Sequence, residues 1–460
     1  MDTYKKLKIL SCVLSFALAP FCIYAQEEPA TDVSEELVSD AEVSTEQTAD
    51  SLIQEFLSEK GWAEGENTKK DGSKFFISVG YGTVSAPITH KSYNSSRIRA
   101  FDKAMLDAKA KMAETLEQTI SASVTSFYEE SSGGMTETPD QELARVEKDA
   151  PPSGIVDKAA LWVSKKLDNA LREEGYDIDA EKAKTREERE RIASRAKELI
   201  STDTFSKSVN SLANVSIAGL QAFYTVEAQN GDKGKVAVVA IWSPALAEMV
   251  NAFVSGKPMK GTKAKKTIKE QIPTSTQELL STFGVQQKIN ERGEYVLVSF
   301  GQAAANSSNS RAERAAYDKA RLNAQAQIRQ FAGENVAVSR AQEEAEQSLE
   351  FDDGGIDYSD EQSYKSFLQS VAKGMVCNGI QSLRNWKAVH PISGKPVFGV
   401  ICTWSPSQAS WAKQTKKKVE AAGTPSKSGV SSGGKAPKKS EPTGVSEFSG
   451  AGSAGDEDAF

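Results

Sequence analysis

The amino-acid sequence predicts an α+β fold: two tandem two-layer β-α-β-β units with small, mostly antiparallel sheets, a helical insertion in the first unit, and disordered termini. Three observations lead to this prediction. They are an internal duplication, strand-rich segments that alternate with one long amphipathic helix per unit, and hairpin-turn signals near the end of each unit. The 460 residues suffice for two or three domains, and 39% hydrophobic with 26% charged residues is a composition typical of globular chains.

The duplication is visible as four segments that recur in the same order in both halves of the chain. The matching pairs are QEFLSEKGW with QELLSTFGV, FFISVGYGTV with YVLVSFGQAA, FDKAMLDAKAKM with YDKARLNAQAQI, and GLQAF with GIQSL. Because four ordered matches are hard to produce by chance, we assign residues 51–255 to a first repeat and residues 273–413 to a second.

The chain begins with a segment typical of export. Lysines precede an apolar run at 9–24 that is too short to span a bilayer, and Ala25 ends the run before the acidic QEEPA. This pattern predicts a signal peptide at 1–25, cleaved after Ala25, and therefore a periplasmic, cell-surface or secreted protein. Residues 26–50 contain nine acidic residues and no lysine or arginine, which predicts a disordered segment.

Each repeat starts with a short helix, followed by a strand and a long helix. In the first copy the short helix places Leu52, Phe56 and Leu57 on one side. The strand ends in Gly-x-Gly or Gly-x-Ala, which predicts a bend or a close approach of another backbone. These residues are Gly80, Gly82, Gly301 and Ala303. The long helix has an alanine-rich face suited to close packing on a sheet. That face is Phe101, Ala104, Ala108 and Met112 in the first copy and Tyr317, Ala320, Ala324 and Ile328 in the second.

Each repeat closes with two strands and a turn into a further helix. The strands flank AQNGDKG in the first copy and HPISG in the second, and both turns carry hairpin signals. A Trp-Ser-Pro triplet follows each time: Trp242, Ser243 and Pro244, then Trp404, Ser405 and Pro406. We expect each Ser to cap a helix, each Pro to take the first helical position, and each Trp ring to cover the edge of the sheet. Gln408, three residues after the second serine, predicts a capping box.

Three further segments lie outside the repeated pattern. An insertion at about 130–200 contains the amphipathic helix GIVDKAALWVSKKLDNAL, which either packs on its own repeat, the interpretation we favour, or is a partner-binding arm. A lysine-rich linker at 256–272 and a Gly-, Ser-, Pro- and Lys-rich tail at 414–460 are expected to be disordered. Their lysines are either solvated or in weak contact with a membrane or a polysaccharide.

Two cysteines remain after removal of the signal peptide. Cys377 and Cys402 both lie in a strand-rich region of an exported chain. A disulfide between them and two separate buried thiols are both open interpretations.

The segments FISVGYGTV…AFDKAMLDAKAKMAETL and VLVSFGQAA…AAYDKARLNAQAQIRQFAG resemble a known type of domain. Their strand, Gly-x-Gly or Gly-x-Ala, loop and alanine-rich helix are similar to bacterial LPP-twenty-type lipoprotein domains and to the N-terminal domain of flagellar H/T-ring proteins. The resemblance implies two divergent envelope domains with a structural or interaction role and no catalytic centre. It covers the first strand and long helix of each copy. Phe21 precedes Cys22 where a lipid-anchor motif needs a small residue, so lipid anchoring is not carried over.

The sequence offers no catalytic, cofactor-binding or metal-binding constellation. The two histidines, His90 and His390, stand at non-matching places of the repeats, and neither has a recognisable partner for a Ser-His-Asp or Cys-His site. The acidic segment FDDGGIDYSDE fails the calcium-loop pattern because Tyr358 stands where that loop needs glycine. The Gly80-x-Gly82 pair lacks the third glycine of a phosphate-binding loop.

We therefore expect an exported, non-catalytic bacterial envelope protein with a structural or partner-binding role. Its partner would be another envelope protein or a second copy of the chain. A hydrolase of cell-envelope polymers and a peripheral membrane- or polysaccharide-binding protein stay open as alternatives. The net charge of −7, about −9 after removal of the signal peptide, argues with the predicted export against a nucleic-acid partner.

Overall fold

The structure, a computed structural model, describes most of the two repeats and one part of the tail. The described residues are 48–131, 154–178, 185–217, 219–231, 233–247, 249, 261, 263–305, 309–347, 362, 364, 366, 377–412, 414 and 447–455. The predicted signal peptide, the acidic residues 26–47 and the acidic loop at 351–361 lie outside them.

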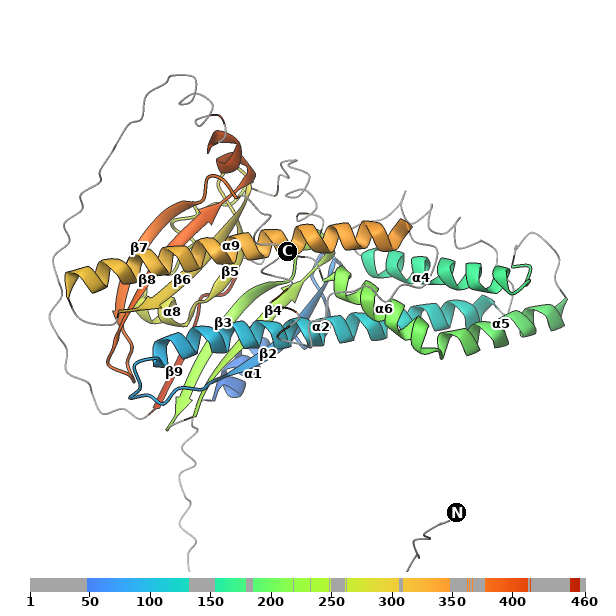
Figure 1. Ribbon diagram of the computed structural model, residues 1–460, viewed down its shortest axis with the longest axis horizontal. Helices are drawn as coiled ribbons and strands as arrows, with labels where there is room; N and C mark the ends of the chain where they lie inside the picture. The colour runs from blue at the N-terminus through green and yellow to red at the C-terminus, as the bar shows by residue number, and fades with distance from the viewer. Residues whose placement is uncertain are drawn as a thin grey trace, which may run out of the picture. The chain divides into compact units, whose positions relative to one another are not determined.

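The described chain is α+β, with two sheets in which all strand pairings are antiparallel (Figure 1). The strand order is β1-β2-β4-β3-β9 in the first sheet and β5-β6-β8-β7 in the second. The strands are β1 Gly65–Thr68, β2 Lys74–Val84, β3 Gln221–Asn230, β4 Lys233–Trp242, β5 Gly284–Ile289, β6 Tyr295–Ala304, β7 Gln381–Val389, β8 Pro396–Trp404 and β9 Glu447–Ala451. The helices are α1 Ala49–Lys60, α2 Tyr93–Ser131, α4 Gly154–Glu173, α5 Arg186–Ile200, α6 Asp203–Ser216, α8 Thr276–Ser281 and α9 Ser310–Gln347.

The two repeats share one core topology. The order β2-β4-β3 with α2 in the first repeat matches β6-β8-β7 with α9 in the second. The short strands β1 and β5, which pair with β2 and β6, were not predicted. The sequence of β1, GENT, is polar and only four residues long, so it carries no strand signal of its own.

Glycines allow each long helix to lie directly on its sheet. A Cβ atom on Gly80 or Gly82 would overlap the backbone of α2, and a Cβ atom on Gly301 would overlap the backbone of α9. Ala303, two residues further on, is buried under α9. The prediction that Gly-x-Gly and Gly-x-Ala mark a close backbone approach is confirmed.

Both faces of each sheet are covered. Alternate residues of β4 enter opposite clusters: Val238 and Ala240 pack with α2, whereas Val239 and Ile241 pack with α1. The second sheet packs on α9 with one face and on α8 and Ile272 with the other. The short helices therefore add a layer to the predicted two.

The insertion packs on its own repeat. Its helices α4 and α5, and α6 directly after it, lie along the distal half of α2 (Figure 1). On α4, Val163, Leu167 and Leu171 are buried in the same cluster as Leu116 and Ile120 of α2. The predicted amphipathic helix is present, and its apolar face is buried against α2.

The Trp-Ser-Pro triplets end the last strands of both repeats, as predicted. The Oγ atoms of Ser243 and Ser405 accept hydrogen bonds from the backbone N–H three residues later, each at 3.2 Å. Pro244 and Pro406 are the first helical residues. A capping box in the second copy would require the Gln408 side chain to accept a hydrogen bond from the Ser405 amide. Instead, Gln408 Oε1 has no hydrogen-bond partner among the described residues, and Nε2 donates to the Thr403 hydroxyl at 3.3 Å. The predicted capping box is therefore wrong.

The tryptophan rings do not cover a sheet edge. Strands β4 and β8 are inner strands of their sheets. Trp242 is fully buried in the cluster under α2, and Trp404 lies in the cluster under α9 with its Nε1 donating to the Asn378 carbonyl at 3.0 Å. The prediction of an edge position is wrong, because β4 and β8, which carry the two tryptophans, have a neighbouring strand on each side.

Three segments predicted to be disordered contain ordered residues. Helix α1 begins at Ala49, where Thr48 and Ser51 form a capping box. In the lysine-rich linker, the amide of Gly261 donates to the Gly293 carbonyl at 2.8 Å, and Ile272 is buried against the second sheet. In the tail, residues 447–455 lie along β3. Composition does not reveal these segments because each is ordered by contacts with distant parts of the chain.

Candidate binding site at the junction of the two repeats

Ionisable side chains from both repeats meet in a fully buried cluster. Arg97 of α2 donates from Nε and Nη2 to the two carboxylate oxygens of Glu227 on β3, and its Nη2 also donates to the Leu280 carbonyl of α8 at 2.9 Å. His390, in the turn between β7 and β8, places Nε2 3.4 Å from Oε1 of Glu227. Arg97, Glu227 and His390 are 0%, 1% and 0% exposed. The edge-on ring of Tyr93 lies 5.3 Å from the imidazole, centroid to centroid.

The charges in this cluster stabilise one protonation state. Burial by itself raises the pKa of Glu227, but the charge and the hydrogen bonds of Arg97, together with the nearby His390, outweigh it and lower that pKa to about 2. Burial and the nearby Arg97 lower the pKa of His390, against the opposing effect of Glu227. At neutral pH the cluster therefore holds one guanidinium, one carboxylate and a neutral imidazole. Because the Leu280 carbonyl and the His390 imidazole of the second repeat both contact this ion pair of the first repeat, we interpret the cluster as a joint between the repeats.

A second buried bridge joins the two long helices. The Nζ of Lys109 on α2 donates to Glu334 Oε2 on α9 at 2.6 Å and to the Tyr364 hydroxyl at 2.5 Å. That hydroxyl donates in turn to Glu334 Oε2 at 3.0 Å. Close by, the amide of Gly219 donates to Oδ1 of Asn335 on α9 at 2.9 Å. The repeats are thus joined by hydrogen bonds at buried positions as well as by apolar contact.

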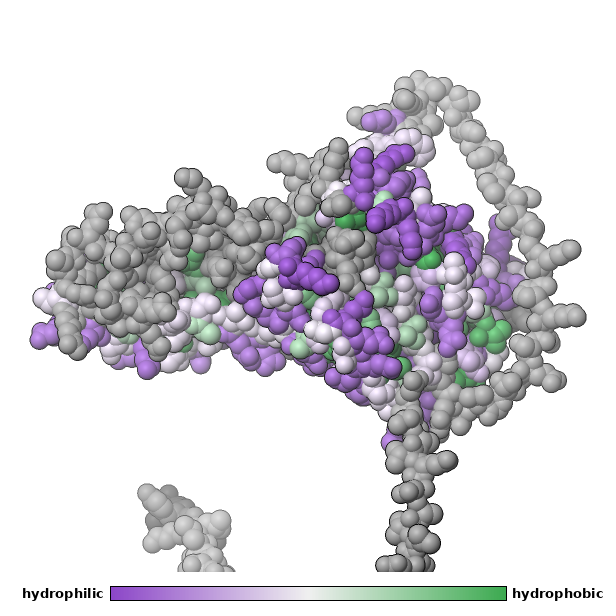
Figure 2. Space-filling view, turned by 180° about the vertical axis from the view of Figure 1, so that it is seen from behind, coloured by the Kyte–Doolittle hydropathy of each residue, from purple (hydrophilic) through white to green (hydrophobic). Residues whose placement is uncertain are grey.

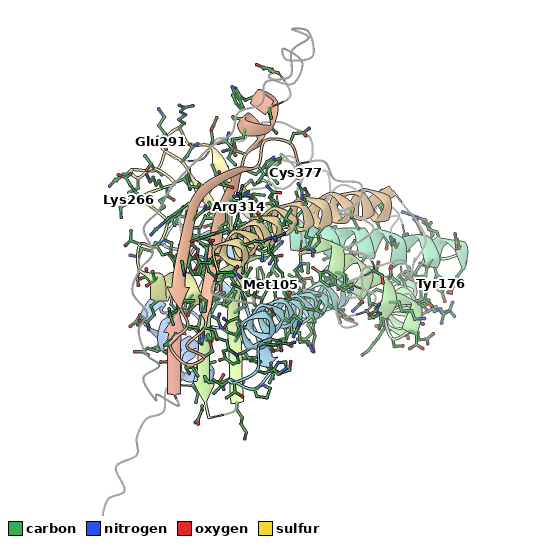
Figure 3. All side chains as sticks on the ribbon, turned by 60° about the vertical axis from the view of Figure 1, so that its left-hand side comes forward. Met105, Tyr176, Lys266, Glu291, Arg314 and Cys377 are labelled. Atoms are coloured by element: carbon green, nitrogen blue, oxygen red, sulfur yellow. The ribbon has the colours of Figure 1, made fainter. Side chains whose placement is uncertain are left out.

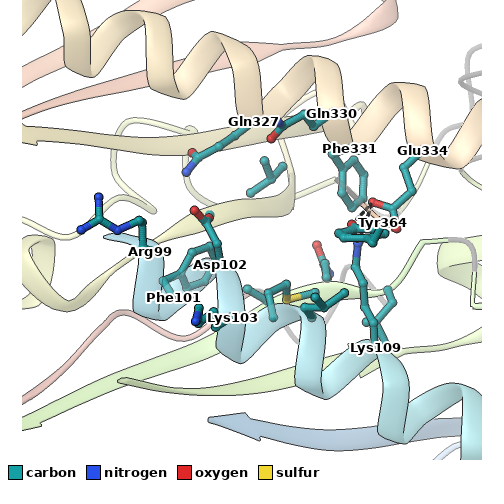
Figure 4. Close-up of a pocket in the computed structure, with 17 residues that line it drawn as sticks. Arg99, Phe101, Asp102, Lys103, Lys109, Gln327, Gln330, Phe331, Glu334 and Tyr364 are labelled. Carbon is teal, nitrogen blue, oxygen red and sulfur yellow. Dashed lines mark hydrogen bonds and ion pairs between the residues drawn. The ribbon is translucent and has the colours of Figure 1, made fainter. Parts of the chain in front are cut away.

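A cavity of about 320 Å³ lies between α2 and α9, beside this bridge (Figure 4). Its apolar lining includes Phe101, Leu106, Leu220, Val285 and Phe331. Its polar lining includes Arg99, Asp102, Lys103, Gln327 and Gln330. Figure 4 shows Asp102 of α2 facing Gln327 of α9 across the opening, with Tyr364 closing one end. Met105, which also lines the cavity, lies between the two helices in Figure 3.

The cavity has the chemistry of a small binding site. Pockets that hold small ligands have volumes from roughly 300 Å³ upward and combine an apolar interior with a few polar groups. Here both repeats contribute to the lining, so the cavity exists only when they are joined. The buried bridge of Lys109 and Glu334 fixes the distance between the two helices at that point.

The repeat markers singled out in the sequence lie in the scaffold, away from the cavity. Gly80, Gly82, Gly301 and Ala303 face the long helices, and the Trp-Ser-Pro residues end strands or begin helices. They position α2 and α9, from which most of the polar lining comes.

The two cysteines are free thiols in the structure. Cys377 and Cys402 are buried in the same cluster under α9, and Cys402 Sγ lies 3.8 Å from the Ser382 hydroxyl. Burial raises the pKa of both thiols. Of the two open interpretations, the structure has the separate buried thiols.

The importance of His390 could not be seen in the sequence alone. His90 lies in an exposed loop with Nδ1 2.6 Å from the Ser92 hydroxyl, whereas His390 faces a carboxylate of the other repeat. A signal did exist in the duplication. Aligning the two repeats matches Arg97 with Glu313 on the long helix and Glu227 with Lys387 on the strand. Each repeat thus has two oppositely charged residues at the same helix and strand positions, and Glu313 and Lys387 also form an ion pair.

The described residues contain neither a metal-binding cluster nor a helix suited to cross a membrane. Within these ranges, His, Cys, Asp and Glu side chains form no group of three or more that could hold a metal ion. Nor does any helix there combine the length and the hydropathy that crossing a bilayer requires.

Comparisons with known proteins touch parts of this architecture. Residues 153–255 match a family described as a domain of unknown function (DUF6844). That range includes α4, α5, α6, β3 and β4. No curated protein matches the chain. Among solved structures, the chain is similar to a hypothetical protein, FTT1539c, from Francisella tularensis, at 15% identity and a TM-score of 0.45, over 82% of this chain and 94% of that one.

Proposed function

We propose that this protein is an exported bacterial envelope protein that binds a partner, and that it has a structural rather than a catalytic role. Its partner is another envelope protein, which contacts the junction of the two repeats. The export part of this proposal rests on the N-terminal sequence pattern, and the binding part rests on the junction.

The cavity between α2 and α9 is the observation that carries the proposal. Its apolar interior and charged rim suit one large apolar side chain of a partner, flanked by polar groups. Elsewhere on the described surface the large exposed hydrophobic residues are Leu322, Val389 and Trp411, which are well separated in sequence. Figure 2 shows one face on which hydrophilic side chains predominate and hydrophobic ones form small, separate patches. A partner would therefore gain most apolar contact by inserting a side chain into the cavity.

The hydrolase alternative is less well supported by the groups at the junction. Acid–base hydrolysis of a polymer needs carboxyl groups that can exchange protons with a substrate. Glu227 is held as a buried carboxylate by Arg97, and Glu334 is bonded to Lys109 and Tyr364. Glu334 joins the repeats directly through Lys109, and Glu227 contacts the second repeat through His390.

Exposed lysines favour a second candidate function. Lys263, Lys265, Lys266 and Lys269 are all exposed on one short segment beside the second sheet. Clustered cations of this kind bind anionic lipid headgroups or anionic polysaccharide. Sedimentation with anionic and neutral vesicles, comparing the parent chain with a variant in which all four are glutamine, tests this candidate.

Site-specific photocrosslinking in the producing bacterium tests the main proposal. A photoreactive residue at Gln330, on the cavity rim, is compared with the same residue at Leu322, which is exposed on the same helix but does not line the cavity. We expect one protein, identified by mass spectrometry, to be captured from position 330 and not from position 322. Filling the cavity with Ala222→Phe should abolish the capture. Equal capture from both positions, or turnover of cell-wall or glycan substrates by the purified chain, would overturn the proposal.

A further inference from the structure

A segment from the C-terminal tail completes the first sheet. Strand β9 pairs antiparallel with β3, from Glu447 opposite Asn230 to Ala451 opposite Val226. The chain then continues along β3, where the amide of Gly452 donates to the Thr225 carbonyl at 2.6 Å. We call residues 447–455 the tail strand. It covers the edge of β3, which would otherwise expose unpaired backbone groups.

The tail strand also contacts the second repeat. The amide of Ser453 donates to the Thr282 hydroxyl at 2.9 Å, and its carbonyl accepts a hydrogen bond from Gln286 Nε2 at 2.9 Å. The amide of Gly455 donates to the Phe223 carbonyl of β3 at 2.6 Å. The tail strand therefore lies in a groove with β3 of the first repeat on one side and residues 281–286 of the second repeat on the other. We call this the β3 groove.

The β3 groove selects small residues at defined positions. A Cβ atom on Gly452 would come within 2.5 Å of the Ser281 carbonyl oxygen, and one on Gly455 within 2.6 Å of the Phe223 ring. Ala451 and Ala454 pack against the apolar cluster between α1 and the sheet. The sequence Ala-Gly-Ser-Ala-Gly is thus matched to the groove residue by residue, which a nonspecific covering segment would not require.

The connection to the rest of the chain does not restrict the tail strand to its own groove. Residues 415–446, 32 in number, separate it from Gln414, the last described residue before it. A segment of that length spans at most about 110 Å when extended. The groove binds the tail strand through backbone groups, the Thr282 hydroxyl and the Gln286 side-chain amide, and every copy of the chain presents these groups. Exchange of such an element between identical chains is an established low-cost route to oligomers.

We propose that the β3 groove binds the tail strand of a second copy of the chain, so that the protein self-associates by exchange of its C-terminal strand. This inference rests on the proposed partner-binding role and names a second copy as a partner. Binding within one chain competes with exchange, because the tether gives the strand an effective concentration on the order of millimolar. Exchange therefore increases as the protein becomes concentrated, as it would in an envelope assembly.

Disulfide trapping between two different full-length variants tests the exchange. Ala228 of β3 and Ser449 of β9 are paired across the strands, so cysteines there lie on one face of the sheet. A chain with Ala228→Cys is mixed with a chain with Ser449→Cys and oxidised, at protein concentrations from micromolar to millimolar. We expect a covalent dimer whose yield rises at least tenfold over that range. Adding Gly452→Val and Gly455→Val to the Ser449→Cys chain should lower the yield at least tenfold.

The controls separate exchange from other outcomes. Thr83→Cys, on the inner strand β2, replaces Ala228→Cys as an acceptor that has no register with β9 and should give no specific dimer. A single chain that carries both Ala228→Cys and Ser449→Cys should crosslink within itself. If it does so while the mixed chains never form a dimer, the tail strand binds only its own groove and the proposal fails. Failure of the double variant to crosslink would also overturn it. Capture of another protein from Gln330 is independent of both results, so the proposed function is tested separately.

Discussion

The substitution Glu227→Gln should lower the free energy of unfolding by about 3–5 kcal/mol at pH 7. Glutamine keeps the size of the side chain but removes the charge, and it leaves the guanidinium of Arg97, which is 0% exposed, without a counter-ion. The pKa gives an independent magnitude. Its fall from 4.5 to about 2 corresponds to about 3 kcal/mol of preference for the ionised carboxyl in the folded protein.

The same substitution should remove a stage of acid unfolding. Because the folded-state pKa of Glu227 lies below its ordinary value of 4.5, its contribution is fully present above pH 4.5 and is lost as the pH falls towards 2. The pKa of His390 is also lowered, mainly by burial, so an earlier loss begins as the pH falls below 6.5, where only the unfolded chain takes up the proton. Glu227→Gln should abolish the later stage, and His390→Gln the earlier one.

Urea unfolding followed by circular dichroism at pH 7, 5 and 3 measures these effects. The matched control is Glu313→Gln in the second repeat, where the ion pair with Lys387 has side chains 33% and 27% exposed. Solvent screening limits that loss to less than about 1 kcal/mol. Replacing both members of the buried pair, with Arg97→Met and Glu227→Leu, should restore most of the stability. Equal losses for the Glu227 and Glu313 variants would refute the assignment of the buried pair as the joint.

Three other predictions concern the scaffold. Gly80→Val forces α2 away from β2 and should cost about 3 kcal/mol, measured by thermal unfolding, and a midpoint within two degrees of the parent would contradict the close packing. Leu167→Ala on α4 should cost about 2–5 kcal/mol in urea unfolding because Leu167 is fully buried against α2, whereas an insertion that acts as a free arm would lose almost nothing. Cys377 and Cys402 should resist a thiol reagent at pH 8 until urea unfolds the chain, since burial raises the pKa of both, and rapid labelling of the folded protein would show that the thiols are accessible.

The repeated scaffold could be predicted from sequence because its signals are local. Gly-x-Gly, the alanine-rich face and the hairpin turns each report the conformation of a few neighbouring residues, and the duplication supplied each signal twice. Gly231 and Gly394 occupy the hairpin turns with φ of 53° and 60°, as the turn signals require.

The junction could not be predicted because its contacts join residues far apart in the chain. His390 has no recognisable partner in the sequence, since the carboxylate that it faces belongs to the other repeat. The tail strand was hidden for a related reason. Gly, Ser and Ala suggest disorder by composition, whereas in the β3 groove the same small residues are the ones that fit.

The two ion pairs at equivalent positions explain how copies of one unit form a joint. In the first repeat the helix supplies Arg97 and the strand Glu227; in the second the helix supplies Glu313 and the strand Lys387. The positive and negative side chains are exchanged between helix and strand, so the fold of the repeat accommodates both arrangements. What differs is burial, because His390 and the rest of the second repeat cover only the first pair. The ion pair of the second repeat is thus partly solvated, whereas the equivalent pair of the first repeat is buried and contacts the second repeat through His390 and the Leu280 carbonyl. Separating the repeats would return it to water, where such a pair stabilises by less than about 1 kcal/mol. The stabilisation measured for Glu227 thus includes the burial that the second repeat adds to an ion pair within the first repeat.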